Sequence, residues 1–122
     1  MAIDFSLTPE LEAIRARVRT FVDDVIRPGG AIIDGEGGAE PLDGKERLKA
    51  LIGMRKQAHA EGLWLPHMPE EWGGMGLGHV ELAMVQAEAA RSYYGPWVLN
   101  CQAPDEGNMH TLLHWATDAQ KE

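Results

Sequence analysis

The sequence predicts an all-α fold, an up-and-down helical bundle of about four to five helices that forms a single domain over residues 1–122. Two observations carry this prediction. Apolar residues recur at intervals of three and four in successive segments, which is the period of an α-helix with one buried face. Prolines and glycines gather between these segments, where they favour turns and interrupt helices.

The first helix is predicted to begin after Thr8, whose hydroxyl can cap free backbone amides. Pro9 follows at a first-turn position where no amide hydrogen is needed. The apolar stripe of this helix comprises Leu11, Ile14, Val18, Phe21, Val22 and Val25. The run Arg27-Pro28-Gly29-Gly30 is predicted to end it.

Residues 29–44 contain six glycines and are predicted to form a flexible loop. Loops of this kind can carry a binding site, but a variable surface loop is the more common outcome. The composition alone therefore favours a connection without a function of its own.

The second helix is predicted to run from Gly44 to Glu61, with Asp43 or Gly44 at its cap and Gly62 at its end. Its shared face comprises Leu48, Leu51, Ile52, Arg55 and Ala58. Nearly half of the 11 positive charges also lie on it, at Lys45, Arg47, Lys49, Arg55 and Lys56. These charges could dock phosphates or an acidic partner, although a solvated helix face is the simpler interpretation.

The third helix is predicted over residues 79–92, because Val80, Ala83, Met84, Ala87 and Ala90 follow the clearest helical period of the chain. Shorter helices are predicted over 97–101 and 105–114, and another is predicted to start at Thr117. The alanine stripe and the four tryptophans together predict an exposed apolar face and a homo-oligomer.

Composition excludes several classes of function. A net charge of −8 argues against a nucleic-acid partner and against binding to an anionic membrane surface. No apolar run approaches the ~18 residues of a membrane span. Cys101 is the single cysteine, so an internal disulfide is impossible and a cytoplasmic location is expected.

A glycine- and proline-rich segment, Leu65–Gly78, separates the second and third helices and reads LPHMPEEWGGMGLG. Proline fixes φ and glycine permits close backbone approach, so we expect a loop of defined shape. We predict that Trp72 is a buried anchor of this loop and that Gly74 needs a positive φ. The glycines do not fit a phosphate-binding loop, because neither a βαβ unit nor a Gly-Lys-Ser/Thr sequence accompanies them.

This segment resembles the signature of FAD-dependent acyl-CoA dehydrogenases, at Pro69, Glu71, Trp72, Gly73, Gly74, Gly76 and Leu77. Residues 5–28, 63–66 and 116–121 are similar to other parts of the same family's N-terminal helical domain. Residues 100–109 look closest to the long-chain branch that, in multidomain animal proteins, is fused to a kinase-like domain.

The resemblance implies that the parent protein carries out α,β-dehydrogenation of an acyl-CoA thioester, with hydride passing to FAD. In that family the flavin lies between a middle β-domain and a C-terminal helical domain, and the catalytic glutamate belongs to the latter. Neither domain is in this sequence. The resemblance thus implies a truncated piece that has no catalytic or cofactor-binding residue and is inactive alone.

The family's acyl pocket, carried over by position, places a substrate wall at Leu99, Asn100, Ala103, Pro104 and Gly107. These residues could instead only terminate and cap helices, as proline and glycine often do. At the level of the whole chain, the alternative is a self-standing helical interaction module. Such a module would bind a protein partner through the face that once packed on the β-domain.

Glu106, His110 and His114 follow one another at intervals of four and therefore share a helix face. Two imidazoles and a carboxylate could hold a divalent metal. A solvated helix surface is the favoured interpretation, because no HExxH sequence accompanies them, and no metal is predicted.

Overall fold

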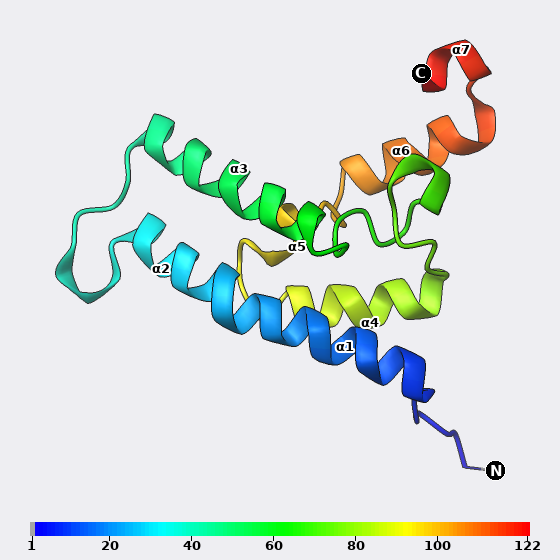
Figure 1. Cartoon of the computed structure of the whole chain (residues 1–122), viewed down its shortest axis with the longest axis horizontal. Helices are drawn as coiled ribbons and strands as arrows, with labels where there is room; N and C mark the ends of the chain where they lie inside the picture. The colour runs from blue at the N-terminus through cyan, green and yellow to red at the C-terminus, as the bar shows by residue number, and fades with distance from the viewer. Residues whose placement is uncertain (1) are drawn as a thin grey trace.

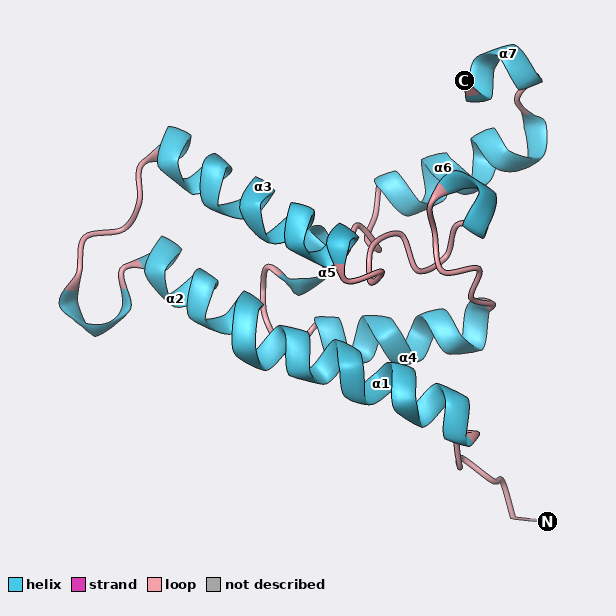
Figure 2. Ribbon diagram, viewed as in Figure 1, coloured by secondary structure: helices cyan, strands magenta, loops and turns pink. Residues whose placement is uncertain are grey.

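The computed structural model describes residues 2–122, which form helices and loops without a strand. A long rod consists of α1 (Pro9–Phe21), a π-helical segment (Val22–Ile26) and α2 (Arg27–Asp34) in direct succession. α3 (Gly44–Ala60) and α4 (His79–Ala89) pack against this rod, and α5 (Gly95–Val98) contacts both of them. α6 (Asp105–Trp115) and α7 (Asp118–Lys121) extend away from it (Figures 1 and 2). The predicted all-α fold is confirmed.

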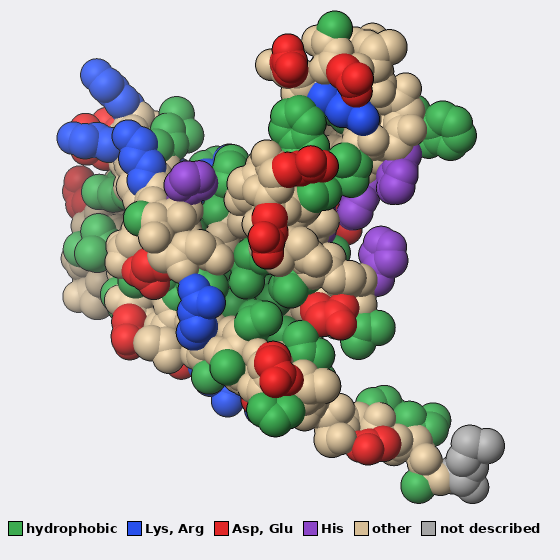
Figure 3. Space-filling view, turned by 45° about the vertical axis from the view of Figure 1, so that its right-hand side comes forward, with side chains coloured by type: hydrophobic (Ala, Val, Ile, Leu, Met, Phe, Trp, Pro, Cys, Tyr) green, Lys and Arg blue, Asp and Glu red, His purple; other side chains and the backbone are tan. Residues whose placement is uncertain are grey.

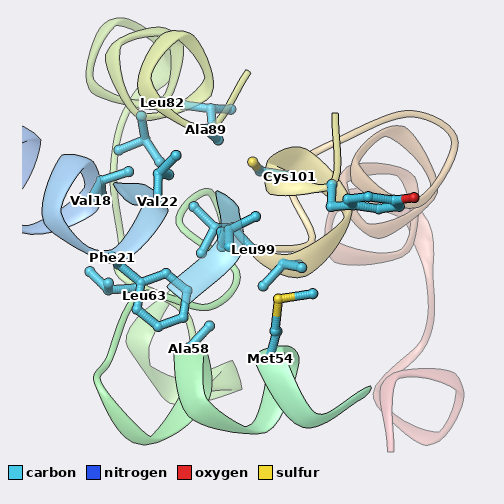
Figure 4. Packing of buried hydrophobic residues seen from close by; sticks show 14 of the residues in the cluster. Val18, Phe21, Val22, Met54, Ala58, Leu63, Leu82, Ala89, Leu99 and Cys101 are labelled. Atoms are coloured by element: carbon cyan, nitrogen blue, oxygen red, sulfur yellow. The ribbon is translucent and has the colours of Figure 1, made fainter. Parts of the chain in front are cut away.

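The hydrophobic core lies where the rod, α3, α4 and the segment after α5 meet (Figure 4). Nine apolar side chains there have no exposed surface: Val18, Val22, Ile26, Ile33, Ala58, Val85, Ala89, Val98 and Leu99. Within residues 2–122, no helix combines the length and apolar character that crossing a bilayer requires.

The predicted helix caps are confirmed. The Thr8 hydroxyl accepts from the Leu11 amide at 3.3 Å, and the Asp43 carboxylate accepts from the amides of Lys45 and Glu46. A capping box joins Thr117 and Gln120 at the start of α7. Each cap satisfies amides that the first helical turn leaves without a backbone partner.

The predicted stop at residues 27–30 is wrong, because helical structure continues through Pro28 to Asp34. Proline in a regular helix clashes with the carbonyl four residues earlier, here that of Asp24. The π-helical segment precedes it, and the Arg27 amide bonds to the carbonyl of Val22, five residues back. This wider turn accommodates the proline ring without ending the helix.

The two glycines after Pro28 serve close packing. A Cβ atom on Gly29 would lie 2.6 Å from the sulfur of Met54, and one on Gly30 would lie 2.9 Å from the Tyr94 ring. The loop predicted over 29–44 is wrong in its first part, because residues 29–34 belong to α2. Its remainder begins at Gly35 (φ +70°) and includes a 3₁₀ turn, Glu36–Gly38.

The predicted faces of α3 and α4 need correction. On α3, Met54 and Ala58 are buried, whereas Leu48 and Ile52 are exposed. On α4, the buried face comprises Leu82, Val85, Glu88 and Ala89. Of the predicted stripe, Met84 is partly buried against the core, whereas Val80 (72% exposed), Ala83, Ala87 and Ala90 are exposed.

The error on α4 has a physical cause, which is that a carboxylate belongs to the buried face. Glu88 is only 6% exposed and accepts two hydrogen bonds from the Arg19 guanidinium, at 2.8 and 3.1 Å. A charged residue at a core position disrupts the apolar period, and pairing makes its burial tolerable.

Trp72 is not the predicted buried anchor, since 40% of its surface is exposed and it lies at the end of a 3₁₀ turn (Glu70–Trp72). The loop is held instead by its own backbone. The amides of Met75, Gly76 and Leu77 donate to the carbonyls of Leu65, Met68 and Pro66, respectively. Positive φ occurs at Gly73 and Gly76, not at Gly74.

Candidate functional site

The five residues predicted to form the substrate wall fall in and beside the turn between α5 and α6. Leu99 is fully buried in the core, where Figure 4 shows it near Met54 and Cys101. Ala103, Pro104 and Gly107 are exposed, and a Cβ atom on Gly107 would meet nothing within 4 Å. The exposed members thus lie at the start of α6, whereas Leu99 belongs to the core.

Asn100 connects the buried and the exposed part of this wall. Its backbone is left-handed (φ +54°) and only 6% of its surface is exposed. Asparagine tolerates this conformation better than most residues. The preceding carbonyl, of Leu99, accepts from the amide of Leu65 at 3.0 Å, which joins the wall to the start of the glycine-rich loop.

Arg55 on α3 contacts the same turn, a role that sequence reasoning missed. Its guanidinium lies 3.6 Å from the centroid of the Trp97 ring. The Nε atom donates to the Trp97 carbonyl at 2.9 Å, and an Nη atom donates to the Asn100 side chain at 3.3 Å. Burial lowers the pKa of Arg55 from its ordinary value.

Gln86 on α4 contacts the turn from another element and was also missed. Its amide nitrogen donates to the Cys101 carbonyl at 2.7 Å and to the Glu106 carboxylate at 3.1 Å. Burial raises the pKa of the Cys101 thiol to about 12, so this thiol stays protonated at neutral pH and is not a nucleophile. No sequence signal marks Gln86, because its partners lie 15 and 20 residues away.

The predicted helix face of Glu106, His110 and His114 is only partly a solvated surface. His114 is exposed, but His110 is half-buried. The Nε2 atom of His110 lies 3.8 Å from Oε1 of Glu106, and the ring centroids of His110 and His67 are 5.2 Å apart. The His79 ring lies 5.8 Å from that of His110. Histidines gather along one edge in Figure 3. Within residues 2–122, no group of three or more His, Cys, Asp or Glu side chains is placed to hold a metal ion.

His67 is the unusual member of this group, since it is 5% exposed and neither ring nitrogen has a hydrogen-bond partner. Its pKa is lowered from 6.5, chiefly by burial, while Glu106 opposes and His110 reinforces the shift. The folded chain therefore resists protonation of His67 more than the unfolded chain does.

We expect the stability contributed by neutral His67 to be complete above about pH 6.5 and to fall as the pH drops below that value. His67→Leu should flatten this acid-side decline and stabilise the chain at pH 5 by about 1–3 kcal/mol, the cost of a buried polar group without a partner. Urea melts at several pH values measure both effects. His79→Leu, at an exposed position, is the control and should retain the decline. An unchanged decline in His67→Leu would contradict the assignment.

A small apolar hollow of about 220 Å³ lies between the glycine-rich loop and α6. Its apolar lining comprises Leu65, Met68, Trp72, Met109, Leu112 and Leu113, and Gln120 and Lys121 of α7 close one side. The hollow and the wall adjoin the same two segments, the glycine-rich loop and α6.

Comparison with known proteins relates this arrangement to one family. The sequence model described as "Acyl-CoA dehydrogenase, N-terminal domain" matches residues 8–122. The human protein "Acyl-CoA dehydrogenase family member 11" is 38% identical over 68 residues, which cover 56% of this chain and 8% of that protein. The "(2S)-methylsuccinyl-CoA dehydrogenase" of Cereibacter sphaeroides is 31% identical over 115 residues, which cover 94% of this chain and 19% of that protein.

A solved structure is also similar, that of a "putative acyl-CoA dehydrogenase" from Mycobacterium abscessus. It superposes with a TM-score of 0.77 at 31% identity, over 96% of this chain and 30% of that one. The chain thus spans less than a third of each of these relatives.

Proposed function

Because the chain belongs to the acyl-CoA dehydrogenase family, as an N-terminal domain, we propose that it serves in a flavin-dependent enzyme that dehydrogenates acyl-CoA thioesters between the α and β carbons. The match over residues 8–122 is the observation that carries this proposal. The similarity in both sequence and fold to the M. abscessus protein supports it.

Within that enzyme, the proposed role of this domain is to form part of the acyl-chain pocket. Ala103, Pro104 and Gly107 are small and exposed. The space beside Gly107 is free, because a Cβ atom there would meet nothing within 4 Å. Leu99 would shape the pocket from behind, because it is buried, and Asn100 would join the two layers. Small side chains leave room for an extended ligand.

FAD is the proposed cofactor of the complete enzyme, and we propose that residues 2–122 do not hold it by themselves. A hollow of about 470 Å³ between α1 and α3 is lined by Asp24 and Glu61 as well as Arg17. Carboxylates at this place would oppose a pyrophosphate. We therefore expect the purified 122-residue chain to show no flavin absorbance in the visible range, and a persistent flavin band would contradict this.

The test of the proposed function begins with the gene. Its sequence beyond residue 122 should encode the remaining domains found in the relatives, and the encoded protein should be yellow. Anaerobic addition of acyl-CoA thioesters should bleach its visible flavin band. A gene that ends at residue 122, or a flavoprotein that no acyl-CoA bleaches, would overturn the proposal. The first of these results would favour the interaction module.

We also propose that the chain self-associates through the outer face of α4. Val80, Ala83 and Ala87 are exposed on this face, and small side chains permit close helix approach. Sedimentation velocity should show a dimer or larger species that Ala83→Glu shifts toward monomer, whereas Lys56→Glu on α3 should not. A monomer at all concentrations would contradict self-association.

A further inference from the structure

We propose that Arg55 and Gln86 are positioning residues, which hold the turn at residues 97–107 from α3 and α4 and thereby fix the shape of the acyl-chain wall. This inference rests on the proposed function for its consequence in catalysis. We call these contacts of Arg55 and Gln86 with residues 97–107 the clamp. They lie within the chain, so the clamp can be tested separately from catalysis.

The clamp of Arg55 acts at the point where the chain leaves α5. The Trp97 carbonyl accepts from Arg55 Nε at 2.9 Å and from the Asn100 amide at 3.2 Å. Because Asn100 is left-handed, its conformation is less favourable for a side chain than the right-handed one. The bond from Arg55 to the Asn100 side chain, at 3.3 Å, holds this residue in place from outside the turn.

The chemistry of arginine suits this task better than that of lysine. A planar guanidinium can stack on an indole and donate two bonds in fixed directions at once. Arg55 does both, because it covers the Trp97 ring at 3.6 Å while its Nε and Nη atoms donate to two different acceptors. A lysine ammonium would keep the charge but lose the stacked fork.

The clamp of Gln86 acts on both sides of the exposed segment. Its Nε2 atom bonds the Cys101 carbonyl, before Ala103, and the Glu106 carboxylate, after Pro104. The two anchor points flank the exposed residues that the proposed function places against the acyl chain. Between these anchor points the Pro104 carbonyl accepts only from the Asn108 amide, at 3.1 Å within the first turn of α6. The hydrogen bonds from α4 to this part of the turn therefore come through Gln86.

A first experiment measures the clamp in the 122-residue chain by amide hydrogen exchange. In Arg55→Lys, exchange at the amides of Asn100 and Cys101 should accelerate by roughly tenfold or more, as expected when hydrogen bonds to a charged donor are lost. Gln86→Met should accelerate the amides of Glu106 and Cys101 while keeping the length of the side chain. Amides at the start of α1, such as that of Glu12, exchange through local opening that leaves these contacts intact, so their rates should not change.

Lys56→Met is the matched control, because Lys56 is exposed and adjacent to Arg55 in sequence. It should leave all these exchange rates unchanged. Equal rates at Asn100 and Cys101 in wild type and Arg55→Lys would overturn the clamp. Equal acceleration at the start of α1 in both variants would also overturn it, because the effect would then not be confined to the turn.

A second experiment uses the complete enzyme. Arg55→Lys and Gln86→Met should raise KM for acyl-CoA several-fold and alter the order of preference among acyl chain lengths, with a smaller change in kcat. Unchanged KM values with accelerated exchange would leave the clamp standing and overturn its role in the wall. An enzyme without acyl-CoA activity even as wild type would overturn the proposed function, and with it the catalytic part of this inference.

Discussion

Gly74→Ala is expected to destabilise the chain by about 3 kcal/mol or more, at or above the upper end of the range for overpacked sites. A Cβ atom on Gly74 would lie 2.0 Å from the Met68 carbonyl oxygen and 2.6 Å from that of Leu65. Both neighbours are backbone atoms that accept hydrogen bonds within the loop, so neither can move without breaking those bonds. The damage arises from close approach, since the φ of Gly74 is not positive.

Denaturant melts measure this effect, with Gly53→Ala as the matched control. Gly53 lies within α3, and a Cβ atom there would meet nothing within 4 Å. Alanine at that position should stabilise the chain by about 0.5–1 kcal/mol, because glycine is a poor helix former. If Gly74→Ala melts like wild type, the loop backbone does not pack as described.

Leu99→Ala is expected to cost about 2–5 kcal/mol, the range for truncating a fully buried leucine. The side chain has no exposed surface and lies at the centre of the cluster in Figure 4. Since a domain of this kind has a total stability of about 5–15 kcal/mol, much of it would be lost. Leu99 would therefore report on the core even though it was first identified as a candidate wall residue.

Leu112→Ala is the control for this substitution, because Leu112 is 49% exposed on α6. Its cost should stay within about 0.5 kcal/mol, as for most surface positions. The midpoint of a guanidinium melt with an unchanged slope would show a true stability difference. Equal costs for the two leucines would contradict the burial of Leu99.

The sequence predicted those features that depend on neighbours in the chain. Thr8, Asp43 and Thr117 begin helices because their side chains reach amides two or three residues onward. The family resemblance was also visible, because its motifs are local and occur in the right order.

Features that depend on distant partners could not be predicted in this way. Glu88 is buried because Arg19, 69 residues away, donates hydrogen bonds to its carboxylate. A charged residue on the buried face interrupts the apolar period, and for this reason the sequence predicted a different face of α4. In the sequence, Arg55 is one positive charge among several on α3. Its role could not be predicted because its partner Trp97 lies 42 residues onward. Such pairings follow from the fold and leave no period in the sequence.

The π-helical segment in the rod also sets the angle, about the helix axis, between the buried face of α1 and that of α2. Val18, Val22, Ile26 and Gly30 are all buried, at steps of four residues. In a regular helix of 3.6 residues per turn, each such step advances by about 40°, so three steps would carry Gly30 about 120° away from Val18. The extra residue of the wide turn absorbs most of this drift. Deleting one residue from 22–26 and restoring a regular helix would leave eleven steps of about 100° between Val18 and Gly30, which is about 20° from three whole turns. Gly30 would then stay beneath the Tyr94 ring and Ile33 in the core, so we expect the packing of α2 to tolerate this deletion. The local irregularity thus acts as a phase adjuster, because it lets the rod contain one more residue while α1 and α2 keep their buried sides in angular register.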